Sequence, residues 1–303
     1  MYRTILVPLD GSPLAERAIP YAQRLAAATV GRVVLLRVVG GPAGEPPRAG
    51  APRREAEAYL HRLADRRGAP PVDPAVDPAV DSEVMEGEAA PTILGEARRR
   101  GADVIVLSTR GRTGLGRWLY GSVADAVMRH AGVPVLLVPA ACKMRGWPID
   151  RALRILVPLD FSALSEAVLP PATELAAPFG AEIVLLSVAP QLVNTDPYGT
   201  AYIGYDSDAD QEERRRYLEG VATGLRAAGH TVRARDAFGI VPAVIEDVAE
   251  EEGVDLIAIA THGSGGATRL LTGSVATRVV QRATVPVLVV RPAEVQPPAE
   301  RER

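Results

Sequence analysis

An internal duplication constrains this chain more than any other feature of its sequence. Residues 5–39 read ILVPLDGSPLAERAIPYAQRLAAATVGRVVLLRVV, and residues 155–189 read ILVPLDFSALSEAVLPPATELAAPFGAEIVLLSVA. The two segments align without a gap and are about half identical. A second pair, residues 102–123 and 254–275, also repeats, from ADVIVLS and VDLIAIA to a shared GSV. Conserved order and spacing over this much sequence indicates two copies of one folding unit.

Each copy alternates short apolar runs with amphipathic segments. In the first copy the pattern predicts strands at 5–10, 33–39, 79–87, 103–108 and 133–139. It predicts helices at 13–28, 54–67, 91–102 and 122–131. Wholly apolar strands separated by helices are typical of a parallel sheet buried on both faces. We therefore predict an α/β fold made of two tandem doubly wound (Rossmann-like) domains, with one sheet per copy.

The repeat also gives the expected domain boundaries. We predict a first domain over 1–140, a linker over 141–151, a second domain over 152–292 and a flexible tail over 293–303. The second copy carries an insertion, QLVNTDPYGTAYIGYDSDAD, at residues 191–210, which we interpret as a lid or a packing surface.

Composition and charge narrow the class of partner. The chain is 47% apolar and 23% charged, as a globular protein is, and its net charge of -3 gives no reason to expect nucleic acid as the main partner. Its apolar runs are shorter than the roughly 20 residues of a membrane-spanning helix. The N-terminal residues MYRTILVPLD show no signal peptide. We expect a cytoplasmic protein with no membrane partner.

Cysteine and lysine are each present once, as Cys142 and Lys143. A single cysteine excludes an internal disulfide and a multi-cysteine metal site. A phosphate loop of the GxxxxGK[ST] type needs a lysine that neither copy supplies, so that class of ATPase is excluded. No group of His, Cys and carboxylate residues has metal-ligand spacing, and we predict no metal site built from protein ligands alone.

Two glycine-rich loops follow the fourth apolar run of each copy. In the first loop Gly111 and Gly114 allow a sharp turn that presents backbone N–H groups. Gly121 and Ser122 then open a helix, with the serine expected as its N-cap. The N-terminus of a helix attracts anions, and Arg112 and Arg117 are placed to reach a polyphosphate. The second loop repeats the arrangement with Gly263, Gly266, Gly273 and Ser274, and with Arg269 alone as a matching arginine.

Glycine loops also serve only to turn a chain, and serine is an ordinary helix cap. The aspartate after the first strand of each copy favours a ligand site over a purely structural loop. Asp10 and Asp160 each follow the first strand of their copy, and the carboxyl ends of parallel strands are where such folds bind ligands. Two such combinations in one chain favour anion binding over the purely structural interpretation.

The chain resembles a tandem universal stress protein over nearly all of both halves. ATP-binding members of that family carry a glycine, two residues, a second glycine, nine residues, then glycine and Ser or Thr. Gly111 with Gly121-Ser122, and Gly263 with Gly273-Ser274, match the last three elements at this spacing. Ser108 and Ala260 stand where the family has its first glycine. The VPLD strand ends also match.

The resemblance implies a five-stranded parallel sheet in each copy and an adenine nucleotide, ATP, ADP or AMP, as ligand. It would place Asp10 and Asp160 at the adenine and ribose, and Val38 and Val188 along the adenine pocket. The remaining residues of the expected set belong to the strand ends and the Gly-Ser pairs: Pro8, Leu9, Pro158, Leu159, Val123 and Val275. A Mg²⁺ ion would enter with ATP, held mostly by phosphate and water.

The function expected is a stress-response or signalling module with one nucleotide site per domain. One alternative is a slow ATPase or phosphotransferase; the loops share no general base, since His262 of the second loop corresponds to Arg110 of the first. The other alternative is a nucleotide-free protein-interaction module. Family members usually dimerise, so we expect the two domains to pair within the chain through VPVLLVP and VPVLVVR. A homodimer of the whole chain and an unknown protein partner stay open.

Overall fold

The structure is a computed structural model that describes residues 1–40, 51–65, 78–109, 121–144, 146–191, 193–195, 201–203, 207–261 and 274–292. The predicted tail and most of both glycine loops lie outside these residues.

The first copy has its strands and helices in the predicted order. The strands are β1 (Thr4–Leu9), β2 (Arg32–Val39), β3 (Ala79–Glu86), β4 (Val104–Ser108) and β5 (Val135–Val138). The helices are α1 (Ile19–Thr29), which follows the short 3-10 helix η1 (Ala15–Ala18), then α2 (Ala51–Asp65), α3 (Ala89–Arg99) and α4 (Ser122–His130).

The second copy repeats this order. Its main strands are β6 (Arg154–Pro158), β7 (Glu182–Pro190), β10 (Thr231–Gly239), β11 (Leu256–Ala260) and β12 (Val287–Val290). Its helices are α5 (Ala163–Glu166), α6 (Leu169–Ala176), η2 (Ala177–Phe179), α7 (Asp208–Ala227), α8 (Val241–Glu251) and α9 (Ser274–Arg282).

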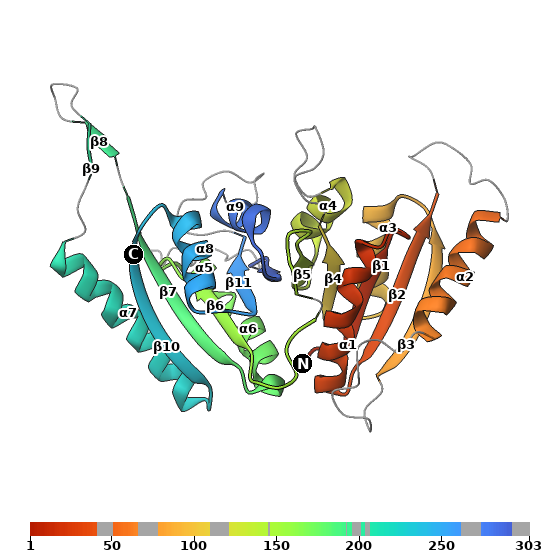
Figure 1. The fold of residues 1–303 in the computed structure, drawn as a ribbon, viewed down its shortest axis with the longest axis horizontal. Coiled ribbons are helices and arrows are strands. Elements are labelled where there is room, and N and C mark those ends of the chain that lie inside the picture. The colour runs from red at the N-terminus through yellow and green to blue at the C-terminus, as the bar shows by residue number, and fades with distance from the viewer. Residues whose placement is uncertain are drawn as a thin grey trace, which may run out of the picture.

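The insertion of the second copy contains a small hairpin of its own. Strands β8 (Val193–Thr195) and β9 (Ala201–Ile203) pair antiparallel and form a sheet separate from the main one. In Figure 1 this hairpin extends from the end of β7, away from the main sheet. The helix α7 begins within the predicted insertion, at Asp208, capped by the Ser207 side chain, which accepts a hydrogen bond from the Asp210 N–H.

Among the described residues, ten strands form one continuous sheet in the order β10-β7-β6-β11-β12-β5-β4-β1-β2-β3. Within each copy all neighbouring strands are parallel. This confirms the predicted α/β class and the five parallel strands of each copy. The five-stranded sheets of the two copies join edge to edge into this one sheet.

The join is the antiparallel pair β5–β12, with Leu136 opposite Leu288 at its centre. These are the strands that the sequence predicted for the seam. Every residue of both strands is buried. An apolar edge strand with unpaired backbone groups is a liability in water, and mutual pairing removes that liability from both copies at once.

Two apolar layers cover the sheet. One face packs against α1 and α2 of the first copy and α6 and α7 of the second. The other face packs against α3, α4, α8 and α9. Figure 1 shows α2 and α7 at opposite ends of the molecule and α4 and α9 on either side of the seam. Equivalent helices thus lie on the same face, and the two copies are related by an approximate two-fold axis perpendicular to the sheet at the seam.

Trp147, in the predicted linker, packs between the copies. The Trp147 ring is buried and makes edge contacts with Tyr21 of the first copy and Phe179 of the second, with ring centroids 5.4 and 5.5 Å apart. Its indole N–H donates to the Asp255 carbonyl at 3.2 Å. The linker therefore adds an aromatic contact on the sheet face that carries α1 and α6.

Candidate functional site

A cavity of about 210 Å³ opens at the carboxyl ends of β1, β2 and β4. The chain runs from β1 to β2 and β3 on one side and returns to β4 and β5 on the other, so strand order reverses between β1 and β4. Ligands in doubly wound folds bind at such a reversal. Eight predicted site residues line this cavity: Pro8, Leu9, Asp10, Val38, Ser108, Gly121, Ser122 and Val123.

The cavity has an apolar base and a polar mouth. Leu36, Ile93, Leu107 and Ala124 are buried and belong to the core between the sheet and α3–α4. Polar groups at the mouth come from the β1–η1 turn, from the ends of β2 and β4, and from the start of α4: Asp10, Ser12, Arg37, Ser108 and Ser122. A hollow with apolar walls and a few converging polar groups is the usual form of a small-molecule site.

The β1–η1 turn holds Asp10 at the mouth. The Ser12 backbone N–H donates to Asp10 Oδ1 at 2.9 Å, and Gly11 between them has a φ of 83°. The Ser12 hydroxyl in turn accepts from the Ala15 N–H at 3.2 Å. These local bonds present an exposed carboxylate at the end of a buried strand.

The N-terminus of α4 is built differently from the sequence expectation. The helix begins at Ser122, and its N-cap is Gly121, with φ 84° and ψ 136° and no side-chain capping bond. The expectation of Ser122 as N-cap is wrong, because Gly121 takes the non-helical position and puts the serine in the first turn. The first-turn N–H groups therefore have no side-chain cap and lie beside the cavity, where an anion is favoured.

Arg37 also lines the cavity, and sequence reasoning missed it. It lies on β2, and its guanidinium donates from Nη1 to the Leu9 carbonyl at 3.2 Å. The same guanidinium lies beside Gly11, with Nη2 3.5 Å from where a Cβ on that glycine would be. Its only trace in the sequence is a charged residue inside the apolar run VVLLRVV, one residue before Val38, and that trace does not show where the guanidinium lies.

The rest of the predicted first site lies outside the described residues, namely Gly111, Arg112, Gly114 and Arg117. In the second copy the same is true of Gly263, Gly266, Arg269 and Gly273. Ser274 is the first residue of α9.

The described part of the second site has the same plan as the first. β6 lies between β7 and β11, so the strand ends that carry Pro158, Leu159, Asp160 and Ala260 are neighbours. Val188 on β7 and Val275 on α9 pack against the same core, as Val38 and Val123 do in the first copy. The Ser162 N–H donates to Asp160 Oδ1 at 3.2 Å, which repeats the turn at Asp10.

A tyrosine–glutamate pair stands beside each aspartate turn. The Tyr59 hydroxyl donates to Glu16 at 3.2 Å, and the Tyr217 hydroxyl donates to Glu166 at 2.8 Å. Burial raises the pKa of both tyrosine hydroxyls, and the glutamates raise it further. Both tyrosines are therefore neutral donors at physiological pH.

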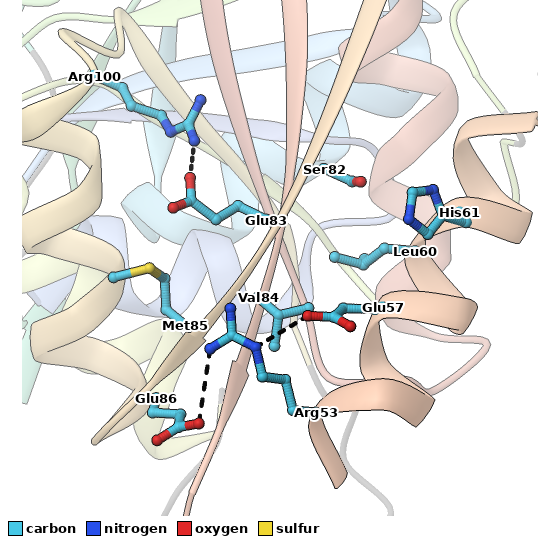
Figure 2. Close-up of a pocket in the computed structure, with 10 residues that line it drawn as sticks. All are labelled: Arg53, Glu57, Leu60, His61, Ser82, Glu83, Val84, Met85, Glu86 and Arg100. Atoms are coloured by element: carbon cyan, nitrogen blue, oxygen red, sulfur yellow. Dashed lines mark hydrogen bonds and ion pairs between the residues drawn. The ribbon is translucent and has the colours of Figure 1, made fainter. Parts of the chain in front are cut away.

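A larger hollow, about 760 Å³, lies at the outer edge of the sheet between α2 and β3 (Figure 2). Its charged side chains pair with one another. Arg53 contacts Glu57 at 3.0 Å and Glu86 at 3.7 Å, and Arg100 pairs with Glu83. None of the predicted site residues lines it. Charged groups along an edge strand discourage further strand pairing, which accounts for this surface without a ligand.

Neither a membrane span nor a protein-built metal centre is present in the described part of the chain. No described helix is both long and apolar enough to cross a bilayer. No three His, Cys, Asp or Glu side chains gather there in a way that would hold a metal ion.

Comparison with known proteins gives a consistent family. The model of the universal stress protein family matches residues 1–139 and again 152–291. A universal stress protein of Mycolicibacterium smegmatis is 29% identical over 303 residues, covering 95% of this chain and 97% of the relative. Universal stress protein Rv2623 of Mycobacterium tuberculosis is 27% identical, and the alignment covers 95% of this chain and 96% of that relative.

Solved structures support the fold. The crystal structure of a universal stress protein from Archaeoglobus fulgidus aligns with a TM-score of 0.71 at 21% identity, covering 96% of this chain and 99% of that one. Two matches of the family model, together spanning most of the chain, show that the protein belongs to the universal stress protein family, with two such domains in tandem.

Proposed function

We propose that the chain binds an adenine nucleotide, ATP, ADP or AMP, at one site in each domain, and that it acts as a stress-response or signalling module. One observation carries the proposal. The cavity at the end of β1 brings the Asp10 turn, Val38 and Ser108 together with the uncapped start of α4.

The parts of the cavity suit the parts of a nucleotide. The apolar base beside Val38 accepts a purine ring, and the Asp10 carboxylate accepts hydrogen bonds from ribose hydroxyls or an exocyclic amine. The volume of about 210 Å³ is smaller than the roughly 300 Å³ at which drug-sized pockets begin. We therefore place the base and sugar inside and the phosphates toward Ser108 and the N–H groups of α4.

Mg²⁺ fits this arrangement as a companion of the nucleotide. It prefers oxygen ligands and keeps several waters, and in nucleotide sites it is bound largely through phosphate oxygens. The chain's own part is to hold the base, the sugar and the phosphates, while the ion offsets phosphate charge when it is bound.

The direct test is calorimetric titration of the full chain with ATP and Mg²⁺, after removal and identification of any co-purified nucleotide. We expect saturation at up to two sites per chain. Asp10→Ala should weaken binding in the first domain, and Asp160→Ala should weaken it in the second. The exposed Asp247 supplies a matched control, because Asp247→Ala lies on α8 outside the cavity lining. Absence of heat, together with absence of carried-over nucleotide, would contradict the proposal.

A further inference from the structure

The two aspartate turns have the same backbone but different supports. Gly11 has a φ of 83° and Phe161, at the equivalent position, has a φ of 67°. A positive φ costs an L-residue roughly 1–2 kcal/mol, so a phenylalanine is held there against its own preference. The turn is kept in the second copy although its glycine is absent.

The Phe161 side chain makes a contact that a glycine at this position cannot make. Its ring stacks on Tyr217 with centroids 4.4 Å apart and planes 25° from parallel. The equivalent space in the first copy is beside Gly11, and there the Arg37 guanidinium lies. The second copy has the buried Ser187 in place of Arg37. The first copy thus combines a glycine in the turn with an arginine on the neighbouring strand, and the second copy combines a phenylalanine with a short serine at the equivalent positions.

The hydrogen bonds to the turn follow the same division. In the first copy Arg37 donates to the Leu9 carbonyl. In the second copy Ser165, which replaces Ala15, accepts from the Asp160 N–H at 3.2 Å and donates to the Ser162 carbonyl at 2.8 Å. One turn is thus held by a cation from the neighbouring strand and the other by a neutral hydroxyl.

We infer that the two candidate sites are not equivalent, and that Arg37 makes the first site the tighter one for ligands that carry phosphate. The inference rests on the proposed nucleotide function. Arg37 lines the first cavity and brings a permanent positive charge to it, whereas Ser187 brings none. A charge near the mouth of a cavity attracts an anionic ligand in proportion to the ligand's own charge, and salt screens that attraction.

The test uses the full chain and two probes, ATP and adenosine, titrated at low and at high salt. We expect two classes of site for ATP in the natural chain. Arg37→Ser, which installs the residue of the second copy, should weaken the tighter class about fivefold for ATP and less than twofold for adenosine. The variant should also flatten the salt dependence of that class. Arg37→Lys retains the charge and should preserve most of the ATP affinity.

A reciprocal variant tests the same inference in the other domain and does not depend on the folding of Arg37→Ser. Phe161→Gly combined with Ser187→Arg gives the second turn the supports of the first, and it should tighten the weaker class for ATP. Equal affinity for ATP at both sites of the natural chain would overturn this inference alone. So would an equal loss of affinity for ATP and for adenosine in Arg37→Ser. Absence of ATP binding at both sites would overturn the proposed function as well.

Discussion

At the scale of single residues, Gly121 has a backbone conformation that other residue types adopt only with strain. Its φ of 84° and ψ of 136° lie in a region that is populated almost only by glycine. It directly precedes the first turn of α4 and lines the cavity. A side chain here would disturb both the helix start and the surface that we propose meets phosphate.

We expect Gly121→Ala to lower the free energy of unfolding by about 1–3 kcal/mol through backbone strain. It should also weaken nucleotide binding in the first domain, because the N–H groups of α4 shift from their positions. Urea unfolding and calorimetric titration measure the two effects. Gly132→Ala is the matched control, since a Cβ at Gly132 would meet nothing within 4 Å. Equal stability of the two variants would contradict the strain argument.

The sequence is informative about site residues that follow from strand-end chemistry. Asp10 could be placed because a strand end at a reversal of strand order is a general ligand position, whereas Val38 was expected only from the resemblance to the family. Arg37 could not be placed, because an arginine on a strand usually extends to solvent. Only the tertiary fold shows that its guanidinium donates to the Leu9 carbonyl. The capping role of Ser122 cannot be read from residue type, which does not reveal that Gly121 has the positive φ.

At the scale of elements, ion pairs connect the edge strand β10 to its neighbours. Arg233 pairs with Glu182 and Glu252, and Arg235 pairs with Glu251 and Glu252. Hydrogen bonds from Arg233 are the main cause that lowers the pKa of both Glu182 and Glu252 below the usual 4.5. Arg154 lowers the pKa of Glu182 further, and Arg235 lowers that of Glu252. The network links β10, β7 and the end of α8.

This network gives stability a defined pH dependence. Because the folded-state pKa of each carboxyl is lower than its unfolded value, the ion pairs stabilise the fold above the ordinary carboxyl pKa. That contribution disappears as the pH falls through the folded-state pKa. The arginines are partly exposed, so each pair is worth only about 0.5–1 kcal/mol.

We expect Glu252→Gln to destabilise the protein at pH 7 by roughly that amount and to have a smaller effect at pH 3. Urea unfolding at the two pH values measures the difference. Glu213→Gln, on an exposed position of α7, is the control and should change stability little at either pH. A Glu252→Gln effect that stays the same at pH 3 would show that the carboxylate charge is not what stabilises β10.

Elements were largely predictable because hydrophobic periodicity determines them locally. The strands and helices follow from apolar runs and from the repeat. The seam at β5 and β12 was expected because family members dimerise and because an apolar edge strand needs a partner. The hairpin β8–β9 was not predictable, because its short strands have no core pattern of their own. The antiparallel direction and the register of the seam were not predicted either, because they depend on how the two edges meet in three dimensions.

At the scale of the whole molecule, the seam resembles a subunit interface within one chain. A half that ends near Gly146 would expose β5, whose sequence VLLV nearly repeats the VLVV of its partner strand β12. We therefore expect the isolated first half to form a symmetric dimer through β5, with the antiparallel pairing seen in the full chain. Sedimentation equilibrium measures the mass. A half that folds and stays monomeric at high concentration would contradict this expectation.

The antiparallel seam has an evolutionary consequence. In a dimer of identical chains, every substitution appears in both sites, so neither site can change without the other. When two copies are joined in one chain, edge to edge at β5 and β12, each copy can vary separately while the shared sheet is kept. It also keeps the two candidate sites together however dilute the protein becomes, since a covalent connection replaces the concentration-dependent step of assembly.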